Sequence, residues 1–521
     1  MSLVRAAFTV SAFTLLSRIT GLIRDIIIAR TFGASAITDA FWVAFRIPNL
    51  LRRLFAEGAF SQAFVPILSQ IKSTESADRT QQVIDRVALV LLLALTLVTL
   101  IGIVGAPFVV MVMASGLTNP SRAQEYNIAV VMTQIMFPYI ICMSMVSLAS
   151  GVLNTFKRFA VPAFTPVLLN LSMIASSIGL SQFFSQPIYA LAAGVMLGGV
   201  LQLATQWVAL LRMGLQPRFS NSIKTSVKDT TVRRVMKQML PATLGVSVAQ
   251  LSLLINTNIA TWLVAGSVTW LSFADRLMEF PTALIGVALG TVLLPSLSRA
   301  HAESADGRYS QLLDWGLRLV FLFGVPAALT MVVLSDALVA TLFNYGAFSA
   351  YDVAQTKTAV MAYSVGLIGL LTVKILAPGF YAKQNIRTPV KIAIFVLVVT
   401  QILNLFLVPW LAHAGLALSI GLGACINALA LLIGLRRRGL YKPETGWFAF
   451  FARQIVAAAV MIVVLYALRD LIPWTSDTLH LAMRAVWLGA FILAGLTAYL
   501  ITLLITGQRL KDFRRAPESK P

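Results

Sequence analysis

Charged residues are scarce in this chain. Only 12% of its 521 residues are Asp, Glu, Lys or Arg, whereas a soluble domain carries about 25%. The chain is 58% hydrophobic, and its mean hydropathy is +0.84. This composition excludes an ordinary water-soluble protein. It predicts an all-α polytopic membrane protein, because apolar runs of about 20 residues cross a bilayer as helices.

Residues that build metal and catalytic sites are also rare. The two cysteines, Cys142 and Cys425, fall in apolar stretches, where we expect buried thiols. The three histidines, His301, His413 and His480, are far apart and accompany no HExxH, DxxxD or Cys-pair motif. A Walker A motif is absent as well, which argues against direct ATP hydrolysis. We therefore expect no catalytic residue, no metal and no cofactor.

Fourteen apolar windows are long enough to be membrane spans. Their approximate bounds are 8–30, 38–66, 87–113, 125–155, 160–183, 187–211, 239–265, 268–297, 311–334, 353–382, 389–410, 413–435, 450–470 and 482–506. An even number places both termini on one side of the membrane. Most of the 41 Lys and Arg residues lie in the loops and termini of that side, and the opposite loops hold only Arg30, Arg122, Arg469 and Arg484. The positive-inside rule then predicts that both termini are cytoplasmic.

The net charge of +21 is not an indication of nucleic-acid binding. Its basic residues are spread over short loops on one membrane face, so topology accounts for most of the charge. The longest basic loop, 213–238, interleaves Val227, Val232 and Val235 with lysines and arginines. It is predicted to form an amphipathic helix at the cytoplasmic interface.

Two parts of the chain repeat at an offset of about 228 residues. The second predicted span ends in a Pro-Ile-Leu-Ser segment at Pro66, and the eighth ends in Pro-Ser-Leu-Ser at Pro295. The segment from Gly151 to Pro162 likewise matches the segment from Gly379 to Pro389. A repeat of six spans predicts two lobes, inserted in the same orientation around a central cavity.

The predicted divisions follow from this repeat. They are an N-lobe at 1–212, a cytoplasmic linker at 213–238, a C-lobe at 239–438, and two extra helices with a basic tail at 439–521.

Five arginines lie inside segments that are otherwise apolar enough to cross a bilayer. They are Arg18, Arg24, Arg52, Arg53 and Arg276. A charged side chain at the bilayer centre costs roughly 2.5 to 3.5 kcal/mol, so such residues normally face a protein interior or a wet cavity. Guanidinium groups bind phosphate oxygens through a bidentate fork. Several of them around one cavity predict an anionic cargo such as a diphosphate.

The alternative is that nearby carboxylates neutralise these arginines. Asp25 is available to Arg18 or Arg24, and Glu57 to Arg52 or Arg53. Either Asp275 or Glu279 is available to Arg276.

Other polar and bending residues surround the arginines. Helical spacing puts Ser17, Gly21 and Arg24 on one stripe, where the glycine permits close approach of a ligand or helix. Candidate gate residues, which would pair with arginines in only one conformation, are Asp39, Glu57 and Asp275. Pro48 and Pro281 are predicted to bend the second and eighth spans at matching places.

Dense motifs in the first, second and eighth spans point to a known family. They are SRITGLIRD from Ser17, TDAF from Thr38, PNLLRR from Pro48, AEGAFS from Ala56, FVP from Phe64, ADRLMEFP from Ala274 and GVALG from Gly286. With these motifs the whole chain resembles the MurJ (MviN) family of lipid II flippases, in the multidrug/oligosaccharidyl-lipid/polysaccharide (MOP) exporter superfamily.

The resemblance implies a function. It implies that an undecaprenyl-diphosphate-linked peptidoglycan precursor is moved from the cytoplasmic to the periplasmic leaflet of the bacterial inner membrane, by alternating access and without covalent chemistry. It also implies that the arginines matching Arg18, Arg24, Arg52 and Arg276 line the central cavity. The last two spans would then hold the lipid tail.

The polar residues of two predicted spans bear on the energy source. Some family members bind sodium through carboxylates on the seventh and eleventh spans. Here those spans offer only amides, at Gln250, Asn256, Asn258, Gln401 and Asn404. We therefore do not expect a sodium site of that kind. The membrane potential is a candidate driving force, because about 2.3 kcal/mol accompanies each elementary charge moved through 100 mV.

Three other functions stay open at the level of sequence. A flippase for another lipid-linked oligosaccharide would satisfy the same diphosphate argument. An ion-coupled multidrug exporter of the same superfamily would share the duplication, but its cavity should be acidic or aromatic. A membrane enzyme acting on polyprenyl diphosphates would need catalytic carboxylates.

The expected partners are a lipid-linked diphosphate saccharide and membrane lipids. Proteins of cell-wall synthesis and division are further candidates. A complete cavity within one chain is compatible with a functional monomer.

Overall fold

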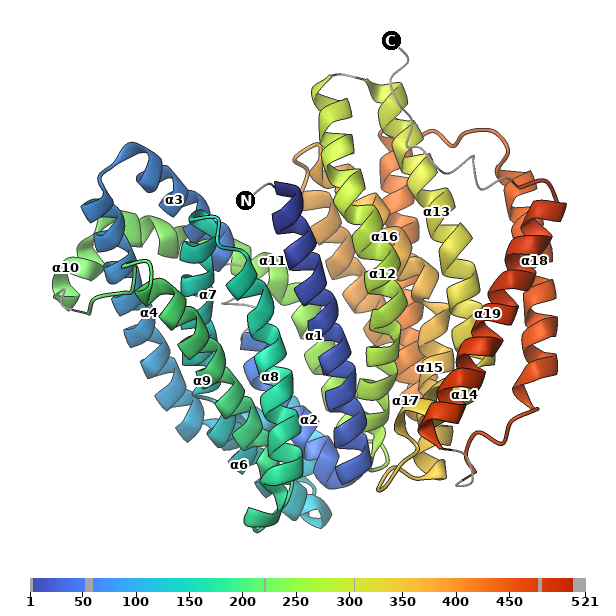
Figure 1. The fold of residues 1–521 in the computed structure, drawn as a ribbon, viewed down its shortest axis with the longest axis horizontal. Helices are drawn as coiled ribbons and strands as arrows, with labels where there is room; N and C mark the ends of the chain where they lie inside the picture. The colour runs from blue at the N-terminus through green and yellow to red at the C-terminus, as the bar shows by residue number, and fades with distance from the viewer. Residues whose placement is uncertain (1–2, 52–59, 220–221, 304, 477–479, 509–521) are drawn as a thin grey trace. The chain divides into compact units, whose positions relative to one another are not determined.

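The computed structural model describes residues 3–51, 60–219, 222–303, 305–476 and 480–508. Every regular element in these ranges is a helix (Figure 1), which confirms the predicted all-α class. The chain forms two compact units, Met1–Thr269 and Trp270–Pro521.

The first unit is built from eleven α-helices within the described ranges. They are α1 (Leu3–Phe32), α2 (Ala36–Leu51), α3 (Ser61–Thr74), α4 (Ala77–Val104), α5 (Ala106–Met113), α6 (Ala123–Met136), α7 (Tyr139–Thr155), α8 (Ala160–Gly179), α9 (Tyr189–Leu211), α10 (Ile223–Lys228) and α11 (Thr230–Thr261). Helix α8 packs between α1 and α9, and α2 packs on α6. Figure 1 shows α1 alongside α8, a pairing that matters for the site below.

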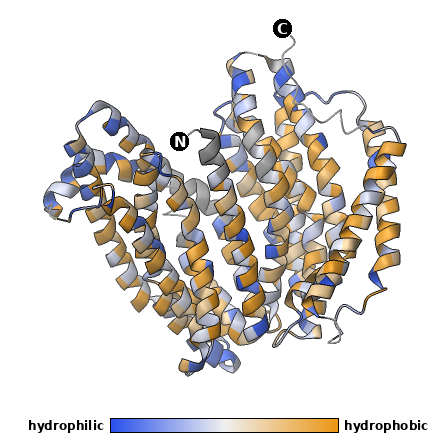
Figure 2. Ribbon diagram, in the orientation of Figure 1, coloured by the Kyte–Doolittle hydropathy of each residue, from blue (hydrophilic) through white to orange (hydrophobic). Residues whose placement is uncertain are grey.

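The second unit holds the remaining helices. They are α12 (Ser267–Ala302), whose first three residues still belong to the first unit, α13 (Asp306–Val333), α14 (Ser335–Phe343), α15 (Ala350–Val365), α16 (Leu367–Tyr381), α17 (Arg387–Arg437), α18 (Trp447–Arg469) and α19 (Leu481–Ile505). Within each unit, hydrophobic residues predominate along the helices and hydrophilic residues gather towards their ends (Figure 2).

Helix α17 consists of two antiparallel halves. Its backbone breaks at Ala412, where φ is 49° and ψ is −127°. A Cβ added to Gly415 would collide with the backbone of Leu407, and one added to Gly423 would collide with the Thr400 hydroxyl. Gly415 and Leu407 lie close to Ala412 on its two sides, and Gly423 and Thr400 lie farther from it. Contacts in this order show that the two halves fold back on each other. The break coincides with the gap between the predicted spans 389–410 and 413–435.

Nine helical segments of the described ranges are long and apolar enough to cross a membrane. They are Ala77–Val104, Pro120–Thr155, Ala160–Gly179, Tyr189–Leu211, Gly307–Val333, Ala350–Tyr381, Arg387–Arg437, Trp447–Arg469 and Leu481–Ile505. They overlap ten of the fourteen predicted spans, since Arg387–Arg437 contains two. The other four are 8–30, 38–66, 239–265 and 268–297, and three of these carry the candidate arginines. The count of fourteen stays a prediction.

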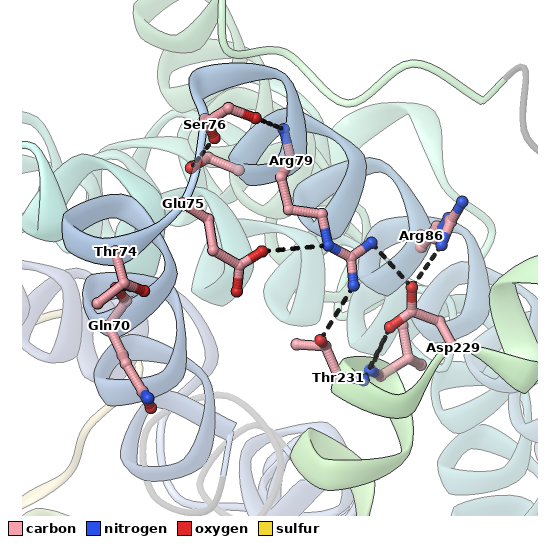
Figure 3. A network of polar contacts seen from close by, with 10 residues as sticks. Gln70, Thr74, Glu75, Ser76, Arg79, Arg86, Asp229 and Thr231 are labelled. Atoms are coloured by element: carbon pink, nitrogen blue, oxygen red, sulfur yellow. Dashed lines mark hydrogen bonds and ion pairs between the residues drawn. The ribbon is translucent and has the colours of Figure 1, made fainter.

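The predicted linker is fastened to α4 by an acidic residue (Figure 3). Asp229 precedes α11, and its Oδ2 accepts hydrogen bonds from Arg86 and, at 3.1 Å, from Nη1 of Arg79. Its Oδ1 caps α11 by accepting from the backbone N–H groups of Thr231 at 2.8 Å and Val232 at 3.3 Å. Burial alone would raise the pKa of Asp229. The two arginines and the two N–H groups outweigh it and lower this pKa from 3.8 to about 2.

The other end of α11 is fastened within the same unit. Arg122 donates to the carbonyl oxygen of Thr261 at 2.7 Å and to that of Leu263 at 2.9 Å. The sequence instead predicts that this helix begins the C-lobe at 239. The lobe boundaries stay a prediction, and the structure adds that α11 packs with the first unit.

The turn before α18 and the start of α18 are joined to α13 through a buried carboxylate. Asp314 accepts hydrogen bonds from the Tyr441 hydroxyl and from Trp447 Nε1, both at 2.8 Å, and its side chain is 1% exposed. Arg318 donates to the same carboxylate at 2.7 Å and to the Thr445 carbonyl oxygen at 2.9 Å. Burial and the bond to Asp314 raise the pKa of Tyr441. The turn between α17 and α18 is thereby folded onto α13.

Two further polar groups fasten α19. Arg484 is 1% exposed and donates to the carbonyl oxygens of Ala340 at 3.2 Å and Ser476 at 2.7 Å. The Tyr499 hydroxyl donates to the carbonyl oxygen of Leu322 at 3.1 Å. Within the second unit, α19 thus contacts α13 and α14 through hydrogen bonds as well as apolar packing.

Candidate functional site

Arg24 lies in a buried polar cluster between α1 and α8. Its Nε and Nη2 donate to Asp25 Oδ1 at 2.9 and 2.6 Å, and its Nη1 donates to Asn170 Oδ1 at 3.0 Å. The exposed fractions of Arg24, Asp25 and Asn170 are 4%, 1% and 6%. A guanidinium within a hydrophobic segment is therefore held by the Asp25 carboxylate and the Asn170 amide.

Asn170 connects this arginine to the preceding turns of α1. Its Nδ2 donates to the Ser17 carbonyl oxygen at 2.9 Å and to Thr20 Oγ1 at 3.2 Å. A Cβ added to Gly21 would lie 3.5 Å from the same amide nitrogen, an ordinary contact. The predicted stripe of Ser17, Gly21 and Arg24 therefore faces α8 at Asn170. Sequence reasoning missed this residue, and the only signal for it was an amide in the apolar segment 160–183.

Arg276 is also paired with a carboxylate. Its Nη1 lies 2.7 Å from Glu279 Oε2, one helical turn along α12. Both side chains are about one-third exposed, at 30% and 37%, and Asp275 is exposed. Arg18 on α1 is partly exposed. The ion pairs that the neutralisation alternative predicts for Arg24 and Arg276 are thus present, and binding of cargo by these arginines stays a prediction.

The candidate gate residue Asp39 binds backbone rather than an arginine in this conformation. Its Oδ2 accepts from the N–H of Gly266 at 2.7 Å. Its Oδ1 accepts from the N–H and the hydroxyl of Thr269, at 2.8 and 2.6 Å. These groups lie at the start of α12, inside the first unit, where helical N–H groups favour an anion. Asp39 itself is 6% exposed.

The other predicted residues are placed as follows. Pro48 is buried in the last turn of α2, and Pro281 lies inside α12, so the predicted bends fall in helices. Three more predicted site residues, Arg52, Arg53 and Glu57, lie outside the described residues.

Three of the five amides in the seventh and eleventh predicted spans, Asn258, Gln401 and Asn404, bind other polar groups. Asn258 accepts a hydrogen bond from Ser115 at 2.9 Å and donates to the Val112 carbonyl oxygen at 2.9 Å. Asn404 donates to Gln401 at 3.0 Å. Among the residues that the structure describes, no three His, Cys, Asp or Glu side chains come together as a metal site.

Comparison with known proteins gives a consistent result over almost the full length. The family described as "Lipid II flippase MurJ" matches residues 28–486. A protein of Burkholderia cenocepacia named lipid II flippase MurJ is 51% identical over 515 residues, covering 99% of both chains. A probable lipid II flippase MurJ of Vibrio cholerae is 39% identical over 524 residues, covering 99% of this chain and 98% of the relative.

Two solved structures share the fold. One is a lipid II flippase MurJ in an inward closed conformation, with a TM-score of 0.80 at 23% identity, covering 97% of this chain and 99% of the other. The second is an inward-facing multidrug resistance MATE family transporter of the MOP superfamily, with a TM-score of 0.67 at 14% identity, covering 83% and 98%. These structures show that the fold is shared with both proteins. Together with the family match and the full-length relatives, they show that this chain is a multi-pass membrane protein and belongs to the lipid II flippase MurJ family.

Proposed function

We propose that this protein is a transporter, not an enzyme, and that it moves lipid II from the cytoplasmic to the periplasmic leaflet of the inner membrane by alternating access. The single observation that carries this proposal is the 51% identity to the Burkholderia relative over 99% of both chains. Lipid II is the lipid-linked peptidoglycan precursor, so the activity serves cell-wall biosynthesis. Both termini are cytoplasmic in this proposal, as the basic loops predict.

The candidate arginines bind the diphosphate of the cargo in this proposal. Arg18 and Arg24 lie on α1 and Arg276 on α12. Arg52 and Arg53 are the remaining members of the predicted set. Guanidinium keeps its charge at any physiological pH and matches phosphate oxygens in pairs. Because no covalent bond in the cargo is made or broken, the arginine side chains need only to bind and release it.

Asp39 acts as a gate residue in this proposal. It holds the start of α12 through Gly266 and Thr269 in the present conformation. Release of those contacts, with transfer of Asp39 to another cationic or N–H partner, would accompany the change to the other conformation.

The driving force is proposed to be the membrane potential rather than a carboxylate sodium site. A cavity rich in arginine carries charge as it reorients, and about 2.3 kcal/mol is available per elementary charge at 100 mV. The partners in this proposal are lipid II and membrane lipids, and a single chain suffices for transport. Cell-wall synthesis and division proteins are the candidate protein partners.

The test is leaflet-resolved accessibility of lipid II in cells depleted of this protein. Rescue is compared between wild type, Arg24→Ala and the matched control Arg30→Ala, at equal membrane abundance. Arg30 is an exposed arginine at the end of the same helix. We expect lipid II to accumulate on the cytoplasmic side, with rescue by wild type and Arg30→Ala but not by Arg24→Ala.

Two other results would redirect the proposal. An unchanged lipid II distribution on depletion would contradict the cargo and favour another lipid-linked oligosaccharide or a drug, as for the MATE transporter of similar fold. Full rescue by Arg24→Ala would keep the cargo and remove Arg24 from its binding site.

A further inference from the structure

Asn170 is the part of the Arg24 cluster that neither the motifs nor the charge pattern indicates. It is 146 residues away from Arg24 in the sequence, yet it contacts α1 through both atoms of its amide. The amide is 6% exposed, so each of these contacts is made away from bulk water. A buried amide that satisfies both its donor and its acceptor is strongly oriented.

The contacts determine which way the amide faces. Oδ1 must face Arg24 because a guanidinium only donates hydrogen bonds. Nδ2 then faces the Ser17 carbonyl oxygen and Thr20 Oγ1, which both accept. A flipped amide would place NH₂ against guanidinium and a carbonyl oxygen against a carbonyl oxygen. The side chain therefore fixes the rotamer of Arg24 relative to the backbone of α1.

The acceptor that Asn170 offers to Arg24 is neutral. Asp25 already supplies one carboxylate to Nε and Nη2 of the guanidinium. A second carboxylate at position 170 would hold Nη1 by a charge-assisted bond, which is roughly twice as strong as a neutral one. An anionic cargo that binds the same guanidinium must displace or share these acceptors. A phosphate oxygen displaces a neutral acceptor from Nη1 more easily than it would displace a carboxylate.

We propose that Asn170 is a positioning residue for cargo binding: it orients Arg24 through a neutral hydrogen bond that the diphosphate group of the lipid cargo can replace. This inference rests on the proposed function, specifically on binding of the cargo by Arg24. Asn170 acts through Arg24 and is not itself assigned a contact with the cargo.

The test uses the full-length protein reconstituted in proteoliposomes with lipid II. The half-saturating lipid II concentration and the maximal flipping rate are measured separately for each variant. Asn170→Asp should raise the half-saturating concentration about tenfold, the factor that corresponds to roughly 1.4 kcal/mol. Asn170→Ala removes the orienting acceptor without adding a competing charge, so it should raise the half-saturating concentration by only about twofold and leave the maximal rate close to that of wild type.

A charge-swap variant separates electrostatics from packing. Asp25→Asn combined with Asn170→Asp exchanges the carboxylate and the amide around Arg24 and restores the wild-type charge of this pair, so it should recover most of the affinity that Asn170→Asp loses. The matched control is Ser172→Ala on the same helix, where the hydroxyl donates to the Gly194 carbonyl oxygen of α9 at 2.7 Å and not to α1. We expect this control to behave as wild type. Thermal melting in detergent identifies any variant that fails to fold.

The outcomes distinguish this inference from the function on which it rests. If Arg24→Ala leaves the half-saturating concentration unchanged, the assignment of Arg24 to the cargo site is wrong. If Arg24→Ala raises it and Asn170→Asp does not, only the role of Asn170 is overturned. Equal increases for Asn170→Asp and Asn170→Ala, without rescue by the charge swap, would show that Asn170 has a packing role and would also overturn the inference.

Discussion

Neutralising Asp229 should release the segment between α10 and α11 from α4. The side chain of Asp229 is 3% exposed, and it ion-pairs with Arg79 and Arg86, which are 26% and 23% exposed. Its pKa falls from 3.8 to about 2, which corresponds to favourable interaction with the ionised form on the order of 2 to 3 kcal/mol. The partial exposure of both arginines reduces the expected loss, because they regain water when the partner is neutral. We expect Asp229→Asn to cost about 2 kcal/mol of local stability.

Limited trypsin digestion of the protein in detergent measures this loss. Lys224, Lys228, Arg233 and Arg234 are exposed cleavage sites around Asp229. When cleavage proceeds through local opening, about 2 kcal/mol corresponds to a roughly 30-fold faster cleavage at pH 7.5. Asp78→Asn is the matched control, because Asp78 is an exposed carboxylate in the first turn of α4. Equal cleavage rates for Asp229→Asn and wild type would refute the reasoning.

The same ion pairs predict a pH dependence. The pKa of Asp229 is lower in the folded state than its ordinary value of 3.8, so its stabilising contribution is present above pH 4 and is lost as the pH falls towards about 2. Hydrogen exchange of the segment around Thr231 should therefore differ between wild type and Asp229→Asn at pH 7. The difference should narrow below pH 4. A difference that stays constant down to about pH 2.5 would contradict an electrostatic origin.

Three other variants test contacts elsewhere. Asp39→Asn weakens two charge-assisted hydrogen bonds to backbone N–H groups, at a cost of about 1 to 3 kcal/mol in the present conformation. The ratio of inward-facing to outward-facing protein should therefore shift, as measured by distances between labels on the two units. Unchanged distances would argue against a gate. Arg484→Met removes the hydrogen bonds that Arg484 donates to the Ala340 and Ser476 carbonyl oxygens and should cost about 2 kcal/mol of stability. We expect a lower melting temperature of the purified protein, and wild-type melting would disprove this. Asp314→Leu removes the acceptor that Arg318, Tyr441 and Trp447 share and should expose the turn before α18 to protease. An equally resistant turn would mean that apolar packing alone holds it.

The membrane helices could largely be predicted from the sequence because hydrophobic length is a local property. Ten spans predicted from apolar runs overlap the described apolar helices. The break inside α17, at Ala412, also falls between two predicted spans. Polar helices were harder to predict. Arg18 and Arg24 interrupt the first predicted span. Whether such a segment crosses the membrane depends on which neighbouring residues cover the two arginine side chains, and a hydropathy value carries no information about those neighbours.

Cross-helix partners could not be predicted for a different physical reason. Spacing along one helix determines which residues share a face, but not which neighbouring helix that face meets. The proximity of Asp25 to Arg24 was therefore foreseeable, and the contact of Asn170 with Arg24 was not. Asp39 illustrates the same limit. A buried carboxylate was predicted to pair with an arginine, whereas backbone N–H groups at the start of a helix satisfy it equally well.

The hydrogen bonds around α18 and α19 bear on how such a protein can gain helices during evolution. The sequence predicts this pair as an addition to a twelve-span core, yet residues of α13 and α14 now depend on it. Without the pair, the buried carboxylate of Asp314 would lose the Trp447 donor, and the Leu322 and Ala340 carbonyls would lose Tyr499 and Arg484. A chain shortened after α17 would therefore not be a self-sufficient core. An addition of this kind is difficult to reverse, because the helices that receive it come to share buried polar contacts with it.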